Sequence, residues 1–365
     1  MGQKIEVLEH GVVYENQTSL FGYCAWPSVA RRDDGALLMV CSGMRMRHVD
    51  PFGKVIQCES LDEGKTWSAP AVIVDTPLDD RDAGILNLGG GNLLVTTFNN
   101  SRKQQLDWTS RWNERDANLV RAYEEYVTPE HENRFFGSLV FRSEDGGRTY
   151  PTFTRLPITA PHGPCLCRDG SLVYVGKEDV NPEQPDRPVS VFGSKDGGRS
   201  WERLGVIPQA EEDRCYTFCE PHVIELPDQT LLAHIRVQDD SAPGKDHCFT
   251  IYQSVSEDGG KTWTTAQPTG ASGSPPHLML HSSGVLISVY GRRIHPFGER
   301  VMLSWDNGKT WDLDEVLTDE DIDIDLGYPT SVELPNGDIF TLYYGKKENS
   351  EEKCSIRYTR WRIAK

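Results

Sequence analysis

One hairpin-like pattern recurs six times along the chain. Each copy has two stretches rich in β-branched and aromatic residues around a turn of Gly, Asn, Asp or Ser, which predicts a β-hairpin. The copies begin at Pro27, Ala83, Gly163, Pro221, Pro276 and Pro329. Their spacing is about 50 to 60 residues, except for about 80 between the second and third copies. A period of this size is typical of repeat proteins whose units pack against one another.

A second motif, S-x-D-x-G-x-x-W or Y, alternates with the hairpins. It occurs five times, beginning at Ser60, Ser143, Ser194, Ser256 and Ser304. The Asp carboxylate can accept backbone N–H bonds within a turn, the Gly permits positive φ, and the aromatic ring packs between units. We therefore expect a structural turn between a third and a fourth strand. The alternative is a ligand or calcium site at each turn.

Six units of four strands predict an all-β protein, a six-bladed β-propeller with four-stranded antiparallel blades, forming one domain over residues 1–365. The sixth unit lacks the Asp motif. We expect its outer strand at Cys354 to Ile363, and the N-terminal strand Ile5 to Tyr14 to complete the blade. Such closure removes free sheet edges.

The long interval is explained by an insertion at residues 101–134, inside the second unit. Helix-forming residues at Asp116 to Tyr126 predict a short surface helix, with Trp108 and Trp112 available for apolar contacts. The insertion could cover one face of the propeller, join two subunits of a homo-oligomer, or only decorate the rim.

Composition excludes several classes of function. A net charge of −17 argues against nucleic acid or an anionic membrane as the main partner. We find no apolar run of the 18 residues that span a bilayer, and no apolar segment of a secretory signal in MGQKIEVLEH. Nine irregularly spaced cysteines, none in a CxxC pair, favour reduced thiols and a cytoplasmic protein without a cysteine metal site.

The start of each inner strand and the end of each second strand must lie on one face of the propeller, opposite the Asp motifs. The starts carry Trp26, Arg81, Asp82, His162, Glu220, His222, His277 and Tyr328. The ends carry Arg45, Arg47, Asn99, Lys177, Arg236, Arg292 and Lys346. This ring of cations in an acidic protein predicts a small anionic substrate, with Arg236 and Arg292 as carboxylate clamps. Alternatively, the cations pair with acids of the same ring.

Five Asp motifs on six blades, with Glu220-Pro221-His222 followed by Arg236 and with Gly327-Tyr328 opening the last unit, resemble the sialidase (neuraminidase) superfamily. The resemblance implies that Tyr328 is the nucleophile and Glu220 the base that deprotonates it. It implies that Arg236 binds the substrate carboxylate, with Arg292 as the second such arginine and Arg293 and Arg300 as rivals. It also implies a general acid at Asp50, with Asp82 as the competing candidate.

The first unit departs from this family. Where sialidases have an arginine, this chain has Ala25-Trp26-Pro27. Arg45, Arg47 or Arg81 could replace that charge, and Trp26 could stack on a sugar ring. We therefore do not expect ordinary exo-sialidase activity.

The histidines His162, His222 and His277 all lie at inner-strand starts. They could bind a divalent metal, bind substrate or transfer protons, or serve only the structure.

Three functions remain open, none with a cofactor. The first is a glycoside hydrolase for an acidic, sialic-type or uronic-type glycan. The second is a lyase that eliminates across a uronic acid, with Tyr328 or a histidine as base. The third is a propeller that binds acidic glycans without catalysis.

Overall fold

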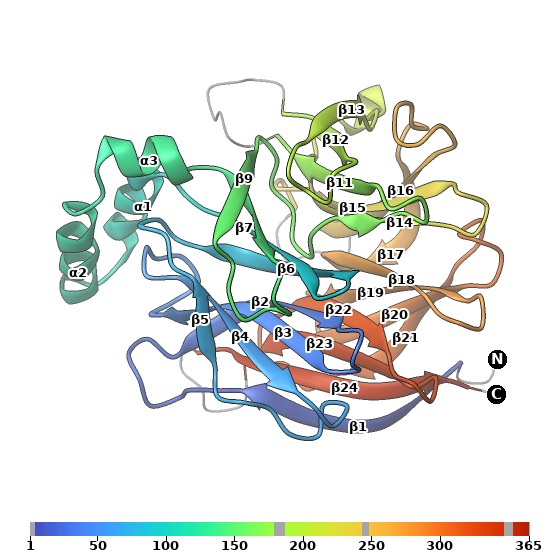
Figure 1. The fold of residues 1–365 in the computed structure, drawn as a ribbon, viewed down its shortest axis with the longest axis horizontal. Helices are drawn as coiled ribbons and strands as arrows, with labels where there is room; N and C mark the ends of the chain where they lie inside the picture. Colours follow the sequence, from blue (N-terminus) through green and yellow to red (C-terminus); the bar gives the residue numbers. More distant parts are fainter. Residues whose placement is uncertain (1–3, 179–186, 243–247, 347–352, 365) are drawn as a thin grey trace.

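The computed structural model describes residues 4–178, 187–242, 248–346 and 353–364. Its strands form six antiparallel sheets of four strands each. The sheets stand as blades around a common axis, with a helical segment on one side (Figure 1). The prediction of an all-β, six-bladed propeller is therefore confirmed.

Within each blade the strands follow one another outward from the axis in chain order. Blades 1 to 3 consist of β2 (Tyr23–Arg31), β3 (Leu37–Arg45), β4 (Lys54–Ser60), β5 (Ala71–Val74); β6 (Arg81–Gly89), β7 (Asn92–Phe98), β8 (Ser138–Ser143), β9 (Thr152–Leu156); and β10 (Cys165–Leu166), β11 (Leu172–Lys177), β12 (Val189–Ser194), β13 (Glu202–Val206). Blades 4 and 5 consist of β14 (Thr217–Glu225), β15 (Leu231–Gln238), β16 (Phe249–Ser256), β17 (Gln267–Ser272); and β18 (Pro276–Leu280), β19 (Leu286–Arg292), β20 (Gly298–Ser304), β21 (Asp312–Thr318).

Blade 6 joins the two ends of the chain. It consists of β22 (Gly327–Glu333), β23 (Ile339–Gly345), β24 (Ser355–Ile363) and, as its outermost strand, β1 (Ile5–Tyr14). The register of β1 on β24 runs from Ile5 opposite Ile363 to Tyr14 opposite Ile356. Lys4 and Ala364 therefore lie side by side, with Ala364 N–H donating to the Lys4 carbonyl at 2.8 Å, and the predicted closure by the N-terminal strand β1 (Figure 1) is confirmed.

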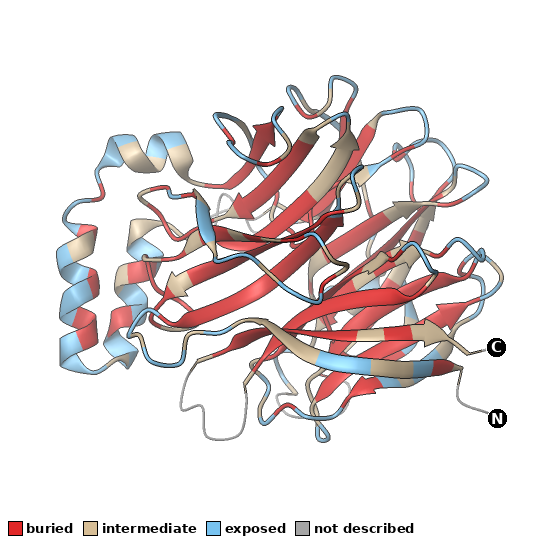
Figure 2. Ribbon diagram, turned by 60° about the horizontal axis from the view of Figure 1, so that its bottom comes forward, coloured by how far each residue is buried: buried red, intermediate tan, exposed pale blue. Residues whose placement is uncertain are grey.

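The hydrophobic core lies between neighbouring blades. Alternate residues of the inner and middle strands pack against the next blade, so buried residues follow the strands through the molecule (Figure 2). Between blades 6 and 1, for example, Phe340, Tyr344 and Ile356 pack against Ile56 and Trp26. Each blade therefore needs both neighbours to bury its two faces.

The five Asp motifs form turns between third and fourth strands. In the fifth motif, Ser304 Oγ donates to Asp306 Oδ1 at 2.8 Å and accepts from Gly308 N–H at 2.7 Å. Thr310 donates to both oxygens of Asp306, and these bonds lower the pKa of Asp306 to about 2. The hydrogen-bonding capacity of the Asp carboxylate is thus met within the motif. This supports the interpretation of the motif as a structural turn.

The insertion is more helical than predicted. It consists of α1 (Arg102–Trp108), the 3₁₀ helix η1 (Thr109–Arg111), α2 (Glu114–Glu124) and α3 (Pro129–Phe135), between β7 and β8. The side chains of Ser101, Asn113 and Thr128 cap the three α-helices. A second 3₁₀ helix, η2 (Glu211–Asp213), precedes β14. Among the described residues, no helix combines the length and the apolar character needed to cross a bilayer.

Candidate active site

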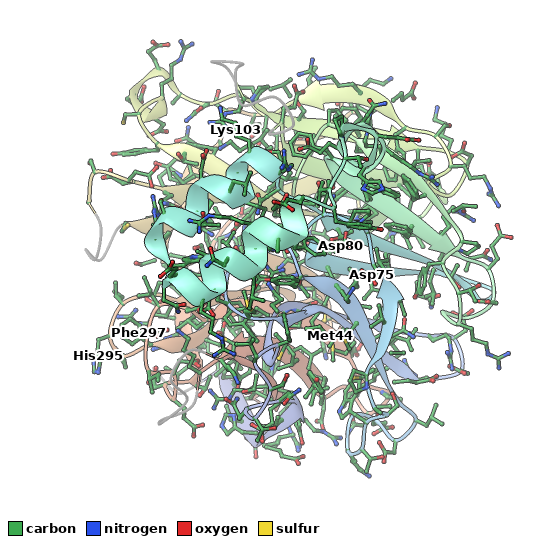
Figure 3. All side chains as sticks on the ribbon, turned by 90° about the vertical axis from the view of Figure 1, so that its left-hand side faces the viewer. Met44, Asp75, Asp80, Lys103, His295 and Phe297 are labelled. Carbon is green, nitrogen blue, oxygen red and sulfur yellow. The ribbon has the colours of Figure 1, made fainter. Side chains whose placement is uncertain are left out.

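One face of the propeller collects the loops between second and third strands and the connections between blades. Figure 3 looks onto this face, with helices α1 to α3 in front. Asp75 and Asp80, from the connection between β5 and β6, and His295 and Phe297, from the loop between β19 and β20, lie around them. We call this face the mouth. The Asp motifs are at the opposite ends of the strands.

Five residues in or just before the inner strands share an unusual backbone conformation at the mouth. Trp26, Asp82, His162, Glu220 and Tyr328 all have positive φ, between 44° and 66°. Register shifts place four of them, all except His162, in β-bulges of their blades. This region of φ is unfavourable for residues other than glycine, and bulges re-aim side chains next to active sites. The bulges therefore re-aim four of these side chains at the mouth, and His162 lies in the connection before β10.

Tyr328 and Glu220 meet across the mouth from blades 6 and 4. The Tyr328 hydroxyl donates to Glu220 Oε1 at 2.7 Å. Arg236, from β15, donates through Nη1 to Glu220 Oε2 at 2.5 Å and lies 3.4 Å from the Tyr328 oxygen. The structure thus brings together the predicted nucleophile, base and carboxylate-binding arginine.

The protonation states of this pair suit proton transfer from phenol to carboxylate. Burial raises the pKa of Tyr328 well above its usual value, and the charges of Glu220 and Asp82 raise it further. Burial by itself also raises the pKa of Glu220. However, the charge of Arg236 and the hydrogen bond from Tyr328 outweigh burial, so the pKa of Glu220 is lowered. Glu220 is therefore ionised and Tyr328 protonated at neutral pH.

The two candidate acids differ in their surroundings. Asp50 is fully buried, and its oxygens accept from the backbone N–H groups of Met46, Arg47 and Phe52 at 2.9–3.0 Å. Asp82 lies beside the Tyr328–Glu220 pair, and its Oδ1 has no hydrogen-bond partner among the described residues. Burial, together with the charge of Glu220, raises the pKa of Asp82 to about 7. The geometry supports Asp82 rather than Asp50 as the acid.

Trp26 does not offer the flat sugar platform that its position suggested. Its side chain is buried, with 1% of its surface exposed, and the guanidinium groups of Arg81 and Arg45 lie over the ring at 4.3 and 4.9 Å. Its edge contacts Tyr328 at a centroid distance of 6.3 Å. Trp26 therefore packs against Tyr328 and is not open to a sugar ring.

Arg45 is likewise fully occupied by contacts within the protein. It is fully buried and forms an ion pair with both oxygens of Asp79, from the connection between β5 and β6. Asp79 Oδ2 lies 3.7 Å from Arg81 and accepts from Gln105 of α1 at 3.1 Å. A buried arginine that is already paired cannot clamp a substrate carboxylate, so this predicted role of Arg45 is wrong.

The Gln105 contact places the insertion beside the mouth. Arg47 forms an ion pair with Asp116 of α2, and Tyr123 donates to the Pro77 carbonyl at 3.1 Å. The helices are thus docked on the loops around Asp79. Whether they also join two subunits remains a prediction.

Among Arg292, Arg293 and Arg300, Arg293 is the one with a contact to the Tyr328 ring. Its guanidinium carbon is 5.8 Å from the centre of the Tyr328 ring and 5.6 Å from that of Phe249, and it donates to the carbonyls of Ile324 and Leu326. Arg300 is buried in an ion pair with Asp319. Arg292 is half-buried, and its Nε has no partner among the described residues.

Several other cations of the predicted ring pair with acids. Lys346 binds Asp323 at 2.9 Å and Asp325 at 3.3 Å, and Arg81 lies 3.9 Å from Asp82. Two other residues of the set bond to backbone. Lys177 forms a β-bridge with Thr159, and the Asn99 side chain donates to the Phe135 carbonyl and accepts from Gly137 N–H at the end of the insertion. Arg81 and Arg236 thus pair with Asp82 and Glu220 of the same ring, as the alternative predicts, whereas Lys346 pairs with acids outside it.

The three histidines converge as expected. The ring centroids of His222 and His277 are 4.4 Å apart and nearly parallel, and His162 lies 5.1 Å from His277. Burial lowers the pKa of each well below its usual value, so all three are neutral. In the described residues, no group of three or more His, Cys, Asp or Glu side chains is arranged to hold a metal ion.

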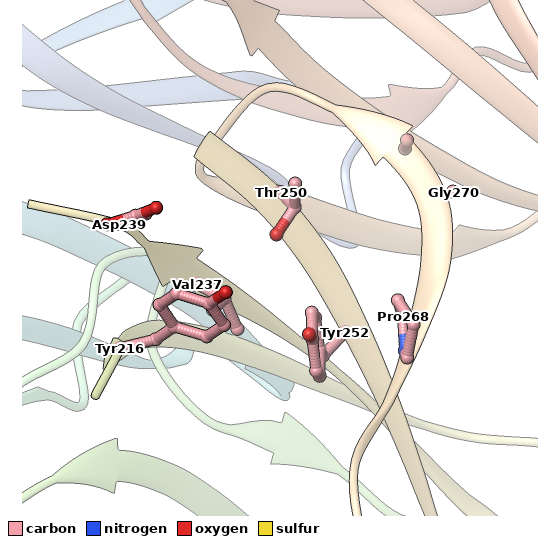
Figure 4. Close-up of a pocket in the computed structure, with 8 residues that line it drawn as sticks. Tyr216, Val237, Asp239, Thr250, Tyr252, Pro268 and Gly270 are labelled. Carbon is pink, nitrogen blue, oxygen red and sulfur yellow. The ribbon is translucent and has the colours of Figure 1, made fainter. Parts of the chain in front are cut away.

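A well-defined pocket lies elsewhere, on blade 4 (Figure 4). It has a volume of about 250 Å³ and is lined by residues that include Tyr216, Tyr252, Asp239 and Thr250. It shares no lining residue with the group around Tyr328. We place the candidate active site at Tyr328, because the reactive side chains converge there.

Sequence reasoning missed Asp79, Gln105 and the full importance of Arg293. The acid-rich run Asp79 to Asp82 before a strand was a possible signal for the first. No local pattern distinguishes Gln105 from its neighbour Gln104, because only the docking of α1 buries one and exposes the other.

Comparison with solved structures places this fold among the sialidases. A protein of unknown function from Dyadobacter fermentans matches with a TM-score of 0.79 and 21% identity, over 99% of this chain and 100% of that chain. The NanB sialidase from Streptococcus pneumoniae matches with a TM-score of 0.65 and 14% identity, over 96% and 70%. The intramolecular trans-sialidase from Ruminococcus gnavus matches with a TM-score of 0.64 and 14% identity, over 96% and 97%.

No curated protein matches the sequence significantly. The family model for the BNR repeat-like domain matches residues 113–341, which is more than half of the chain. The matched region contains four of the Asp motifs as well as Glu220, Arg236 and Tyr328. The chain therefore belongs to the BNR repeat-like domain family.

Proposed function

We propose that this protein is a glycoside hydrolase that acts on an acidic glycan or small acidic glycoside, with Tyr328 as nucleophile. The observation that carries the proposal is the 2.7 Å hydrogen bond from the Tyr328 hydroxyl to Glu220. A neutral phenol is a weak nucleophile, and an ionised carboxylate in this position can take its proton as it attacks. The sialidase-like fold supports the same reaction class.

The first step forms a covalent glycosyl-enzyme. Tyr328 Oη attacks the anomeric carbon and its proton passes to Glu220, while Asp82 donates its proton to the departing glycosidic oxygen. In the second step Asp82 takes a proton from water, which attacks the same carbon. Tyr328 leaves and recovers its proton from Glu220. A carboxyl group with a pKa of about 7 can serve both as acid and as base at neutral pH.

The anionic group of the substrate would bind at the arginines. Arg236 and Arg292 each have a buried Nε without a hydrogen-bond partner among the described residues, and Arg293 adds a charge beside Tyr328. Unpartnered guanidinium N–H groups favour a carboxylate, which accepts charge-assisted hydrogen bonds. These donors support an acidic sugar as substrate.

The test is Tyr328→Phe, which removes the attacking oxygen and leaves the ring in place. With a panel of acidic glycosides that includes sialosides and uronides, we expect kcat to fall at least about a hundredfold. Tyr343→Phe is the matched control, because Tyr343 is a buried tyrosine of the same blade whose hydroxyl bonds Thr359 instead. It should retain wild-type turnover.

Three outcomes would contradict the proposal. Unchanged turnover of Tyr328→Phe would exclude the tyrosine as nucleophile. An unsaturated product that absorbs in the ultraviolet would indicate a uronic-acid lyase. Binding of an acidic sugar by the wild type without any product would indicate a glycan-binding propeller.

A further inference from the structure

The three mouth histidines form a continuous surface from three different blades. His222 lies on β14, His277 on β18, and His162 just before β10. His222 and His277 stack at 4.4 Å, and His162 lies edge-on to both, at 5.9 and 5.1 Å. The ring of His162 is also 6.5 Å from that of Tyr328. We call this surface the histidine floor.

The structure fixes how one of these rings carries its proton. The backbone N–H of Leu278 donates to His222 Nδ1 at 3.0 Å, so the proton of the neutral ring is on Nε2. His162 Nδ1 lies 3.2 Å from the hydroxyl of Ser28 in blade 1. Hydrogen bonds to other blades thus fix the rings of His222 and His162, and His277 is held by stacking on His222.

The histidine floor also has polar atoms that the protein does not use. His162 Nε2 and His277 Nδ1 are buried and have no hydrogen-bond partner among the described residues. Asp82 Oδ1 and the Ser274 hydroxyl are also buried and have no hydrogen-bond partner among the described residues. Buried polar atoms in native proteins almost always have a partner, so such a group marks the place of a polar ligand or water.

The histidine floor is uncharged, whereas Arg236 and Arg293, from the same two blades as His222 and His277, add positive charge beside Tyr328. A neutral imidazole presents one donor and one acceptor, the same capacity as a hydroxyl group. A carboxylate needs donors only and is better bound by the arginines. The histidines and the arginines therefore suit different parts of one ligand.

We propose that the histidine floor binds ring hydroxyl groups of the substrate, so that the substrate is a polyhydroxylated sugar acid whose carboxylate faces the arginines. The proposal rests on the proposed function, because it takes the anion to bind beside Tyr328. It adds that hydroxyl groups, and not the charge alone, determine which acids bind.

The experiment measures binding without turnover, in the Tyr328→Phe background. Two kinds of probe are compared by calorimetry: sugar acids (D-glucuronate, D-galacturonate and N-acetylneuraminate) and tetrahydropyran-2-carboxylate, a ring acid without hydroxyls. We expect at least one sugar acid to bind tenfold or more tightly than the ring acid. Adding His277→Phe should remove that preference and leave the affinity for tetrahydropyran-2-carboxylate unchanged.

Two further variants keep the result interpretable. His277→Asn retains a donor and an acceptor and should keep part of the preference, which a purely structural role would not predict. His295→Phe removes an exposed histidine of the same blade and should change neither affinity. Thermal melting of each variant checks the fold.

The outcomes separate this inference from the proposed function. If the sugar acids and the ring acid bind equally, or if His277→Phe weakens both to the same extent, the histidine floor does not bind hydroxyls. If no acid binds at all, the anion site beside Tyr328 is wrong, and this inference fails with it.

Discussion

At the scale of single residues, Glu220 and Asp82 are two carboxyl groups whose pKa values move in opposite directions. Asp82 is buried and Glu220 half-buried. Arg236 stabilises the charged form of Glu220, whereas Asp82 is left with an unpartnered oxygen beside the charge of Glu220. Pairs of this kind identify a base and an acid within one site. The charge of Glu220 therefore helps to keep Asp82 protonated.

This difference predicts a pH-dependent effect of Asp82→Asn on stability. In the folded protein the pKa of Asp82 is about 7, above its ordinary value near 3.9 in an unfolded chain. Wild-type stability from this group is therefore lost as pH rises through that window. The asparagine variant should gain stability relative to wild type between pH 5 and pH 8, measured by denaturant unfolding.

Asp107→Asn is the matched control, because Asp107 is exposed on α1. Its effect should be small at both pH values. An Asp82→Asn effect of equal size at pH 5 and pH 8 would show that Asp82 titrates normally.

At the scale of elements, the blades carry two kinds of feature at opposite ends of their strands. In four blades, a bulge near the start of the inner strand aims a side chain at positive φ into the mouth. The Asp motif at the far ends ties the third strand to the fourth. Because the two features lie at opposite ends of the strands, loss of one motif should weaken the fold without altering the site.

Ser304→Ala tests this separation. Gly308 N–H is buried and bonds Ser304 Oγ at 2.7 Å, so the variant leaves this donor without its acceptor. We expect a loss of about 1–3 kcal/mol in the free energy of unfolding, with unchanged affinity for acidic sugars. The control Ser110→Ala removes an exposed hydroxyl on the insertion and should change neither quantity. A change of sugar affinity in Ser304→Ala alone would link the two ends of the blade.

At the scale of the whole molecule, the N-terminal strand closes the ring. Ile5 is buried against Trp361 and Ile339, at the point where the last blade would otherwise end in an open edge. The closure joins the first residues of the chain to the last, and a free edge at β24 would invite pairing with other chains.

Ile5→Ala should therefore lower the free energy of unfolding as much as a substitution in the centre of the core does. We expect about 2–4 kcal/mol by urea unfolding, because the strand cannot collapse onto the cavity without leaving β24. Glu6→Ala, exposed on the same strand, should stay within about 0.5 kcal/mol. If the two variants behaved alike, β1 would be a loosely attached strand and not a part of the closed ring.

Much of the fold was predictable because its information is local and repeated. The residues of each hairpin encode its turn, and the residues of each Asp motif encode the hydrogen bonds of that motif. Six copies together predict a ring. Tyr328, Glu220 and Arg236 could be placed together for the same reason, since their positions in equivalent strands assign them to one face. The positive φ of Trp26, Glu220 and Tyr328 was not predictable, because each precedes a proline, where extended backbone is expected.

The sequence by itself determined the propeller, the closing strand and the face on which the reactive residues meet. Only the tertiary structure decided which of those residues remain available to a ligand. Arg45 is paired with Asp79, and Trp26 is covered by Arg81, so neither is available to a ligand. Asp82, Arg293 and the histidine floor, in contrast, lie beside Tyr328. The physical reason is that availability depends on burial and on partners from other blades and from the insertion. Those contacts join residues far apart in the chain, and no local pattern encodes them.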